Sequence, residues 1–154
     1  MKKISADQIR KLRDKTGAPV LRVKKVLEEV SGDEKRAEKI LKEEGFEKAS
    51  KKLGRSTGEG LISTYVHHSG KIASVVEILC ETDFVARNEL FKGLAHSLAL
   101  QVASMNPKDV KELEKQDFVK NPSKKVSELV REVIVKTGEN VRIGRIYRIE
   151  LGGK

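Results

Sequence analysis

The sequence predicts an α+β protein in which a small helical unit precedes a three-stranded antiparallel sheet packed with helices. Three observations support this fold class. Apolar residues recur at helical spacing in the first third of the chain, two stretches rich in β-branched residues flank a short turn, and an alternating stretch closes the chain after further helical segments. No repeat of solenoid length is present, so we expect one helical head joined to one α+β body.

Capping signals place the first helix. Ser5 and Gln8 form a capping-box pattern, an apolar stripe follows, and Gly17 stands where a helix would end. These signals predict a helix over residues 6–16. Pro19 suits the start of a second helix, whose apolar residues repeat at helical spacing as far as Val30.

A third helix completes the predicted head. Asp33 can cap its start, and Gly45 can close it, with Phe46 folding back onto the apolar faces. A basic helical tail follows over residues 47–53. The glycines and small polar residues of the next segment, 54–60, favour a flexible connection.

We place a domain boundary in that connection. Residues 1–54 form the helical N-terminal module with its basic connecting helix, and residues 55–154 form the α+β body. In the body, residues 61–67 and 72–80 are predicted strands, joined by a hairpin turn at residues 68–71.

The rest of the body alternates helical and extended patterns. Residues 88–105 carry an apolar helical face that ends before Pro107 and predict the main core helix. Residues 106–122 are strongly charged and predict a mobile connection. Ser123 then caps a helix that stops at Gly138, and residues 141–151 alternate as a last strand.

Composition narrows the class of protein. Of 154 residues, 38% are hydrophobic and 36% charged, and the start of the chain lacks an apolar stretch that could serve as a signal peptide. Cys80 is the only cysteine, which excludes an internal disulfide and agrees with a reducing compartment. We therefore expect a cytoplasmic protein without a membrane-spanning segment.

The net charge of +9 lies mainly in the head. Residues 1–55 contain 17 Lys and Arg against 10 Asp and Glu. A local basic surface raises the rate at which an acidic partner associates, and that partner could be a protein or a nucleic acid. Charge alone leaves both possibilities open.

The residue patterns contain no convincing catalytic or metal site. His67 and His68 are adjacent and would point to opposite faces of a strand, while His96 lies in another predicted element. Cys80 and His96 lack the local signature of a nucleophile and its base, and a buried cysteine that closes a strand is the more common arrangement. We expect no metal, no cofactor and no enzymatic activity.

Asp83 and Phe84 occupy the junction between the second strand and the next helix, where two interpretations compete. In the first, Asp83 caps the helix and Phe84 packs into the body's own core. In the second, both side chains protrude as a rigid tip, and the ring is an interface anchor that can disturb a partner's pocket. Residue patterns alone favour the first interpretation.

A resemblance to a known family favours the second interpretation of Asp83 and Phe84. The chain contains the run Leu79-Cys80-Glu81-Thr82-Asp83-Phe84-Val85-Ala86-Arg87-Asn88-Glu89-Leu90-Phe91-Lys92-Gly93-Leu94-Ala95-His96. This run resembles the hallmark segment of the elongation factor Ts family. Residues 9–18 and 24–33 are similar to the family's ubiquitin-associated-like N-terminal module, and Gly138-Glu139-Asn140-Val141 is similar to a family motif before a strand. Residues 106–122 match poorly.

The resemblance implies a non-enzymatic guanine nucleotide exchange factor of translation elongation. Its partner would be elongation factor Tu, an acidic GTPase that must exchange GDP for GTP. A nucleotide-release tip would comprise Thr82, Asp83, Phe84 and Val85, with Asp83 and Phe84 inserted beside the nucleotide site, where they disturb magnesium coordination. The head residues at positions that the family uses for partner contacts are Arg13, Val20, Leu21, Lys24 and Lys52.

Chain length adds an expectation about assembly. Many family members have two related core subdomains, and this chain has room for one, so it resembles a short form whose body would be of a dimerisation type. The exposed last strand offers an edge for pairing, and we expect a homodimer.

Two rival functions remain at this point. A protein with +9 net charge could bind ribosomal or other RNA. The predicted strands, however, carry only Tyr65 and Tyr147 as aromatic residues and no aromatic-rich pattern for base stacking, so we expect no specific nucleic acid partner. The head could also be a peptide-binding module on an enzyme body, but no catalytic constellation supports this.

Overall fold

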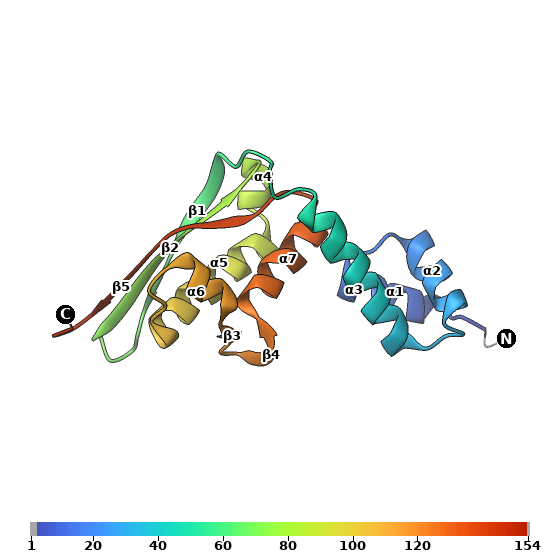
Figure 1. The fold of residues 1–154 in the computed structure, drawn as a ribbon, viewed down its shortest axis with the longest axis horizontal. Helices are drawn as coiled ribbons and strands as arrows, with labels where there is room; N and C mark the ends of the chain where they lie inside the picture. The colour runs from blue at the N-terminus through green and yellow to red at the C-terminus, as the bar shows by residue number, and fades with distance from the viewer. Residues whose placement is uncertain (1–2, 154) are drawn as a thin grey trace.

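The computed structural model describes residues 3–153 and confirms the α+β class (Figure 1). A helical head lies at one end of the molecule, and a long three-stranded sheet backed by helices forms the body. No helix within the described residues is long and apolar enough to cross a membrane. In chain order the elements are α1 (Ala6–Thr16), α2 (Val20–Glu29), α3 (Glu34–Ser50), β1 (Glu59–Val66), β2 (Ile72–Cys80), α4 (Asp83–Ala86), α5 (Glu89–Met105), α6 (Val110–Lys115), β3 (Asp117–Phe118), β4 (Asn121–Lys125), α7 (Val126–Thr137) and β5 (Arg142–Glu150).

The head is built as its capping signals predict. The Ser5 hydroxyl accepts a hydrogen bond from the Gln8 backbone N–H while the Gln8 side chain accepts one from the Ser5 N–H, which is the reciprocal capping box. Gly17 ends α1 with a φ of 70°, a left-handed conformation that glycine adopts without steric cost. The three helices enclose an aliphatic cluster of Leu12, Val23, Val26, Leu27, Val30, Ala37 and Leu41.

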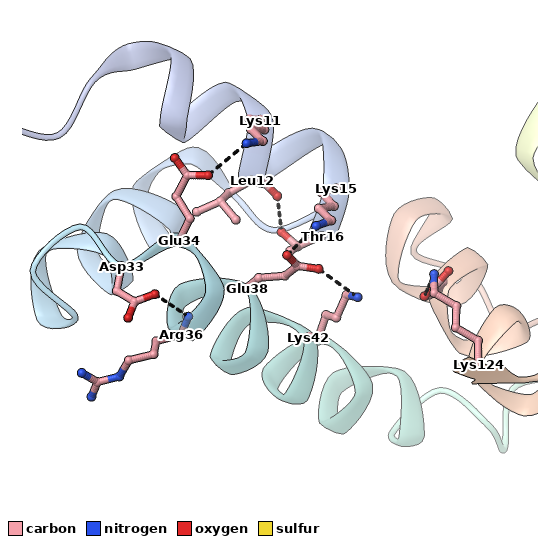
Figure 2. Close-up of polar contacts among 11 residues, drawn as sticks. Lys11, Leu12, Lys15, Thr16, Asp33, Glu34, Arg36, Glu38, Lys42 and Lys124 are labelled. Atoms are coloured by element: carbon pink, nitrogen blue, oxygen red, sulfur yellow. Dashed lines mark hydrogen bonds and ion pairs between the residues drawn. The ribbon is translucent and has the colours of Figure 1, made fainter. Parts of the chain in front are cut away.

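Ion pairs fasten α1 to α3 around this cluster (Figure 2). Lys11 Nζ lies 3.1 Å from a carboxylate oxygen of Glu34, and Glu38 accepts from both Lys15 at 2.5 Å and Lys42 at 3.0 Å. The hydrogen bond from Lys15 is the main reason why the pKa of Glu38 lies below its usual value. The stability that these pairs contribute is therefore present above the ordinary glutamate pKa and is lost as the pH falls through the lowered one.

The prediction that Gly45 ends the third helix is wrong. Helix α3 continues to Ser50, and Gly45 lies inside it, where a β-carbon would approach the Val135 side chain on α7 to 3.2 Å. The glycine thus allows α3 and α7 to pack closely rather than ending a helix. Phe46 does not fold back onto the head either, because it lies half-buried on α3 with the Arg131 guanidinium 5.8 Å from its ring centroid.

The sheet has the order β1-β2-β5 with both pairings antiparallel, as predicted from the strand patterns. Alternate residues of β2 point inward, and the inward ones include the fully buried Val76, Ile78 and Cys80. Helix α5 covers this inner face and contacts β1 and β2. The Ser74 hydroxyl donates a 2.5 Å hydrogen bond to the Ala99 carbonyl of α5, which fixes the helix across the sheet.

Residues 106–122 are not a mobile connection, contrary to the prediction. Asp109 caps α6 by accepting from the Glu112 N–H at 2.8 Å, and the short strands β3 and β4 pair with each other. The buried Gln101 side chain of α5 organises this region, since its Nε2 donates to the Asp117 carbonyl at 3.0 Å and its Oε1 accepts from the Val119 N–H at 2.9 Å.

The predicted Ser123 cap is wrong as well. Ser123 lies in β4, and α7 begins three residues later at Val126 with no side-chain cap.

The face of the sheet that points away from α5, called here the outer sheet face, carries exposed apolar side chains from all three strands. The strand register places Ile62 opposite Glu77, Tyr147 opposite Val75, and both Val66 and Ile149 opposite Ala73. A Glu77–Arg145 ion pair of 2.8 Å crosses the face. The exposed apolar side chains at this surface are Ile62, Val66, Val75, Tyr147, Ile149 and, just after β5, Leu151.

The head and the body have separate apolar clusters. Ala49 near the end of α3 nevertheless belongs to the cluster of the body, so α3 reaches from one unit to the other. The division into residues 1–54 and 55–154 remains a prediction.

Candidate functional site

A one-turn helix at the end of β2 presents an exposed aromatic side chain. Thr82 is the N-cap of α4, and its hydroxyl accepts a hydrogen bond from the Val85 N–H at 3.3 Å. Val85 is only 8% exposed and packs into the body core, whereas Phe84 is 79% exposed. We call residues 82–85 the tip. Its geometry directs two neighbouring apolar side chains in opposite directions, one into the core and one into solvent.

The core-packing interpretation of Asp83 and Phe84 is therefore wrong. Thr82, not Asp83, caps the helix, and Phe84 does not belong to the buried apolar cluster of the body. Asp83 is half-exposed and accepts from the Arg87 guanidinium at 2.7 Å, one helical turn away. Asp83 and Phe84 both lie on the accessible side of the tip.

A carboxylate from the distant end of the chain holds the base of the tip. Glu139, in the turn between α7 and β5, accepts from the backbone N–H groups of Glu81 at 3.1 Å and Thr82 at 2.9 Å. Its second oxygen accepts from the Thr82 hydroxyl at 2.7 Å. In return, Glu81 accepts from the Asn140 N–H at 2.7 Å. These four hydrogen bonds, called here the Glu139 bracket, join segments 57 to 59 residues apart in sequence.

Cys80 supports the tip from below. Its side chain is fully buried, and the thiol donates to the Thr82 carbonyl at 3.1 Å. Burial, together with the nearby charge of Glu139, raises the pKa of the Cys80 thiol to about 11. The thiol is therefore neutral at physiological pH, which suits a structural donor and does not suit a nucleophile.

The same turn also fixes the connection between head and body. The buried Asn140 side chain donates to the backbone carbonyls of Leu53 at 3.3 Å and Arg55 at 2.9 Å. The Arg55 guanidinium lies 3.6 Å from the Glu81 carboxylate. The connection that the sequence predicted to be flexible is thus tied to the base of the tip.

The five head residues singled out from the sequence lie on α1, on α2 and in the turn after α3. Leu21 is 82% exposed and Val20 45% exposed on the first turn of α2. Lys52 borders a cleft of ≈ 200 Å³ between the α1–α2 loop, α3 and α7. Arg13 and Lys24 are exposed. The structure therefore places Lys52 at the start of the connecting segment that Asn140 holds, and the other four residues on α1 and α2.

Sequence reasoning missed Arg22 and Lys48, which line the same cleft, and also missed the structural role of Glu139 and Asn140. Gly138-Glu139-Asn140 was visible as a motif, but its contacts with the tip depend on the fold. Within residues 3–153, no group of three or more His, Cys, Asp or Glu side chains could hold a metal ion. The ring centroids of His67 and His68 lie 4.1 Å apart. Both residues follow the end of β1 at Val66, so their side chains do not alternate between the two faces of the sheet.

The fold and the tip define a class of protein. A helical head, one α+β body and an exposed aromatic ring on a braced turn describe a protein that acts by contact with a macromolecular partner.

Comparison with known proteins assigns the family. Residues 81–154 match the family model described as Elongation factor TS. Elongation factor Ts of Thermotoga neapolitana is 41% identical over an alignment of 192 positions that includes 97% of this chain and 98% of the relative. The proteins of the same name from Herpetosiphon aurantiacus and Leptospira biflexa are 38% and 36% identical, each over 97% of this chain and 98% of the relative.

The chain therefore belongs to the elongation factor Ts family, and it is a non-catalytic nucleotide exchange factor for elongation factor Tu in translation elongation. The alignment with the Thermotoga protein runs over 192 positions while this chain has 154 residues, so the relative carries stretches without a counterpart here.

Phe84 is exposed and Val85 is buried, so truncation of the two side chains should change the stability of the protein by different amounts. Phe84→Ala should change the free energy of unfolding by less than about 0.5 kcal/mol, as expected of an exposed site. Val85→Ala should lower it by about 1.5–3 kcal/mol, because it removes buried apolar surface. Urea denaturation followed by circular dichroism measures both. A destabilised Phe84→Ala variant with an unaffected Val85→Ala variant would contradict the described orientation of the tip.

Proposed function

We propose that the tip is the part of this exchange factor that releases GDP. Asp83 and Phe84 enter the GTPase beside its nucleotide site and disturb the coordination of magnesium there, while the head contacts the nucleotide-binding domain. The observation that carries this proposal is the 79% exposure of Phe84 on a helix whose next residue is buried. The protein would act in the cytoplasm, where translation takes place.

Linkage explains why such an insertion needs no covalent chemistry. A protein that binds the nucleotide-free GTPase more tightly than the GDP-bound form must weaken GDP binding by the same coupling free energy. The tip can supply this difference in affinity only if its ring fills a space, or makes contacts, that are available in the nucleotide-free GTPase and not in the GDP-bound form. A rigid ring does this more effectively than a mobile one, because little conformational entropy is lost when it inserts.

The exposed side chains of the head support a second contact with the same partner. Leu21 and Val20 lie exposed beside Lys24, which combines apolar area with positive charge. This composition suits an acidic protein surface with an apolar centre, since charged residues steer association and apolar ones supply affinity. Lys52 would extend the contact towards the tip.

Removal of the Phe84 ring should slow nucleotide release. We expect Phe84→Ala to lower kcat/KM for GDP release from bacterial elongation factor Tu by about thirtyfold or more, because loss of a central aromatic anchor costs about 2 kcal/mol or more. Release of a fluorescent GDP analogue under an excess of unlabelled nucleotide measures this change. Met105→Ala removes another exposed apolar side chain far from the tip and is the matched control. Equal activity of the two variants would disprove the role of the ring.

We also propose that two copies of the chain pair through the outer sheet face. That face combines exposed apolar side chains on both edge strands with a central ion pair, an arrangement that can be complementary to itself about a two-fold axis. We therefore assign a second copy of the chain to this face. Pairing at the edge of β5 would be a further contact between the two copies.

A charge placed on the outer sheet face should prevent this pairing. Ile149→Glu buries an unpaired carboxylate in the proposed interface and should raise the dimer Kd by about tenfold or more. Size-exclusion chromatography with light scattering, over a series of protein concentrations, measures the oligomeric state. Leu53→Glu, at an exposed apolar residue outside the face, should leave it unchanged. A wild-type protein that stays monomeric throughout the series would refute the dimer and leave the face for another partner.

A further inference from the structure

The hydroxyl of Thr82 has two roles that depend on each other. It donates to Glu139 at 2.7 Å and accepts from the Val85 N–H at 3.3 Å, the bond that caps α4. A threonine hydroxyl has a single hydrogen and two lone pairs. While the hydrogen is directed to the Glu139 carboxylate, a lone pair stays directed at the Val85 N–H. The carboxylate thereby orients the cap of the helix that carries Phe84.

The backbone contacts of Glu139 restrain the same point. One carboxylate oxygen accepts two consecutive N–H groups, those of Glu81 and Thr82, at the place where β2 ends and the chain turns into α4. Hydrogen bonds to an ionised acceptor are stronger than neutral ones, and bonds in a network polarise one another. The direction in which the chain leaves the sheet is therefore set by a side chain outside the tip.

The bracket also aligns the tip with the head. Asn140 donates its backbone N–H to Glu81 and its side-chain amide to the carbonyls of Leu53 and Arg55. The connection from α3 and the base of α4 are thus held by two consecutive residues. Displacement of this turn would change both the direction of Phe84 and its distance from the head.

We propose that Glu139 is a positioning residue for nucleotide release, which acts on the partner only through the orientation of the Thr82-Asp83-Phe84 segment. This inference rests on the proposed role of the tip. It assigns to Glu139 no contact with the GTPase or its nucleotide. Its effect should appear in the rate at which the bound complex loses GDP and should depend on the presence of the Phe84 ring.

Two substitutions at position 139 remove different numbers of these hydrogen bonds. Glu139→Ala removes all three accepted hydrogen bonds. Glu139→Gln leaves an oxygen for the two backbone N–H groups, but its amide nitrogen cannot accept from the Thr82 hydroxyl. Glu132→Gln is the matched control, because Glu132 is also a half-buried carboxylate with a partner, Lys124 at 2.8 Å, and belongs to α7.

The kinetic test separates positioning from binding. We expect Glu139→Ala to lower kcat for GDP release by about tenfold or more with KM little changed, because displacement of a positioned group by about 1 Å can cost a hundredfold in rate. Glu139→Gln should show a smaller decrease in kcat, and Glu132→Gln should match the wild type. In a Phe84→Ala background, Glu139→Ala should cause no further decrease, since the two residues act through one element.

Amide hydrogen exchange of the free protein supplies a second readout. The N–H groups of Thr82 and Val85 should exchange faster in Glu139→Ala, while those of α5 should keep their protection. Uniformly faster exchange throughout the body would show a structural role and overturn the proposal. The Glu139→Gln variant keeps the test valid if the alanine variant does not fold.

The kinetic outcomes distinguish the two proposals. A Phe84→Ala variant as active as the wild type would disprove the proposed role of the tip, and the positioning role would be lost with it. An active wild type with an equally active Glu139→Ala variant would disprove the positioning role alone. An additive loss in the Phe84→Ala background would also overturn it, because Glu139 would then act by another route.

Discussion

The hydrogen bonds between Glu139 and the end of β2 are the constraint on which the arrangement of this molecule depends. They connect the turn before β5 to the segment between the end of β2 and the start of α4. Without this connection, α4 would be held by Val85 and one threonine cap, and a four-residue helix has little stability of its own. The body thus provides rigidity to the short helix that presents Phe84 to solvent.

The aliphatic core supplies the second part of this support. Helix α5 lies across the inner face of the sheet and begins at Glu89, four residues after the end of the tip, so the chain is fixed both before and after Phe84. The head is attached through the close packing of α3 on α7 at Gly45 and through the Asn140 contacts to the connecting segment. The two proposed contact surfaces, on the tip and on the head, are in this way held in one framework.

Local signals predicted what depends on local chemistry. The capping box at Ser5, the glycine that ends α1 and the two strands of the hairpin follow from neighbouring residues, and all were predictable. Gly45 was misjudged because a glycine required for helix packing has the same local pattern as one that ends a helix. The ordered segment after α5 was missed because its stability comes from Gln101, which lies 15 to 18 residues away from its partners. The tip itself was predictable only through family resemblance, and the contacts of Glu139 required the fold.

The central claim is that contact alone, through an exposed aromatic on a braced turn, allows this protein to release GDP. The most direct measurement follows the release of fluorescent GDP from purified bacterial elongation factor Tu, with this protein present in substoichiometric amount and unlabelled nucleotide in excess. The claim predicts that release accelerates many-fold and that each molecule serves many GTPase molecules. An unchanged release rate with a natively folded protein would contradict it.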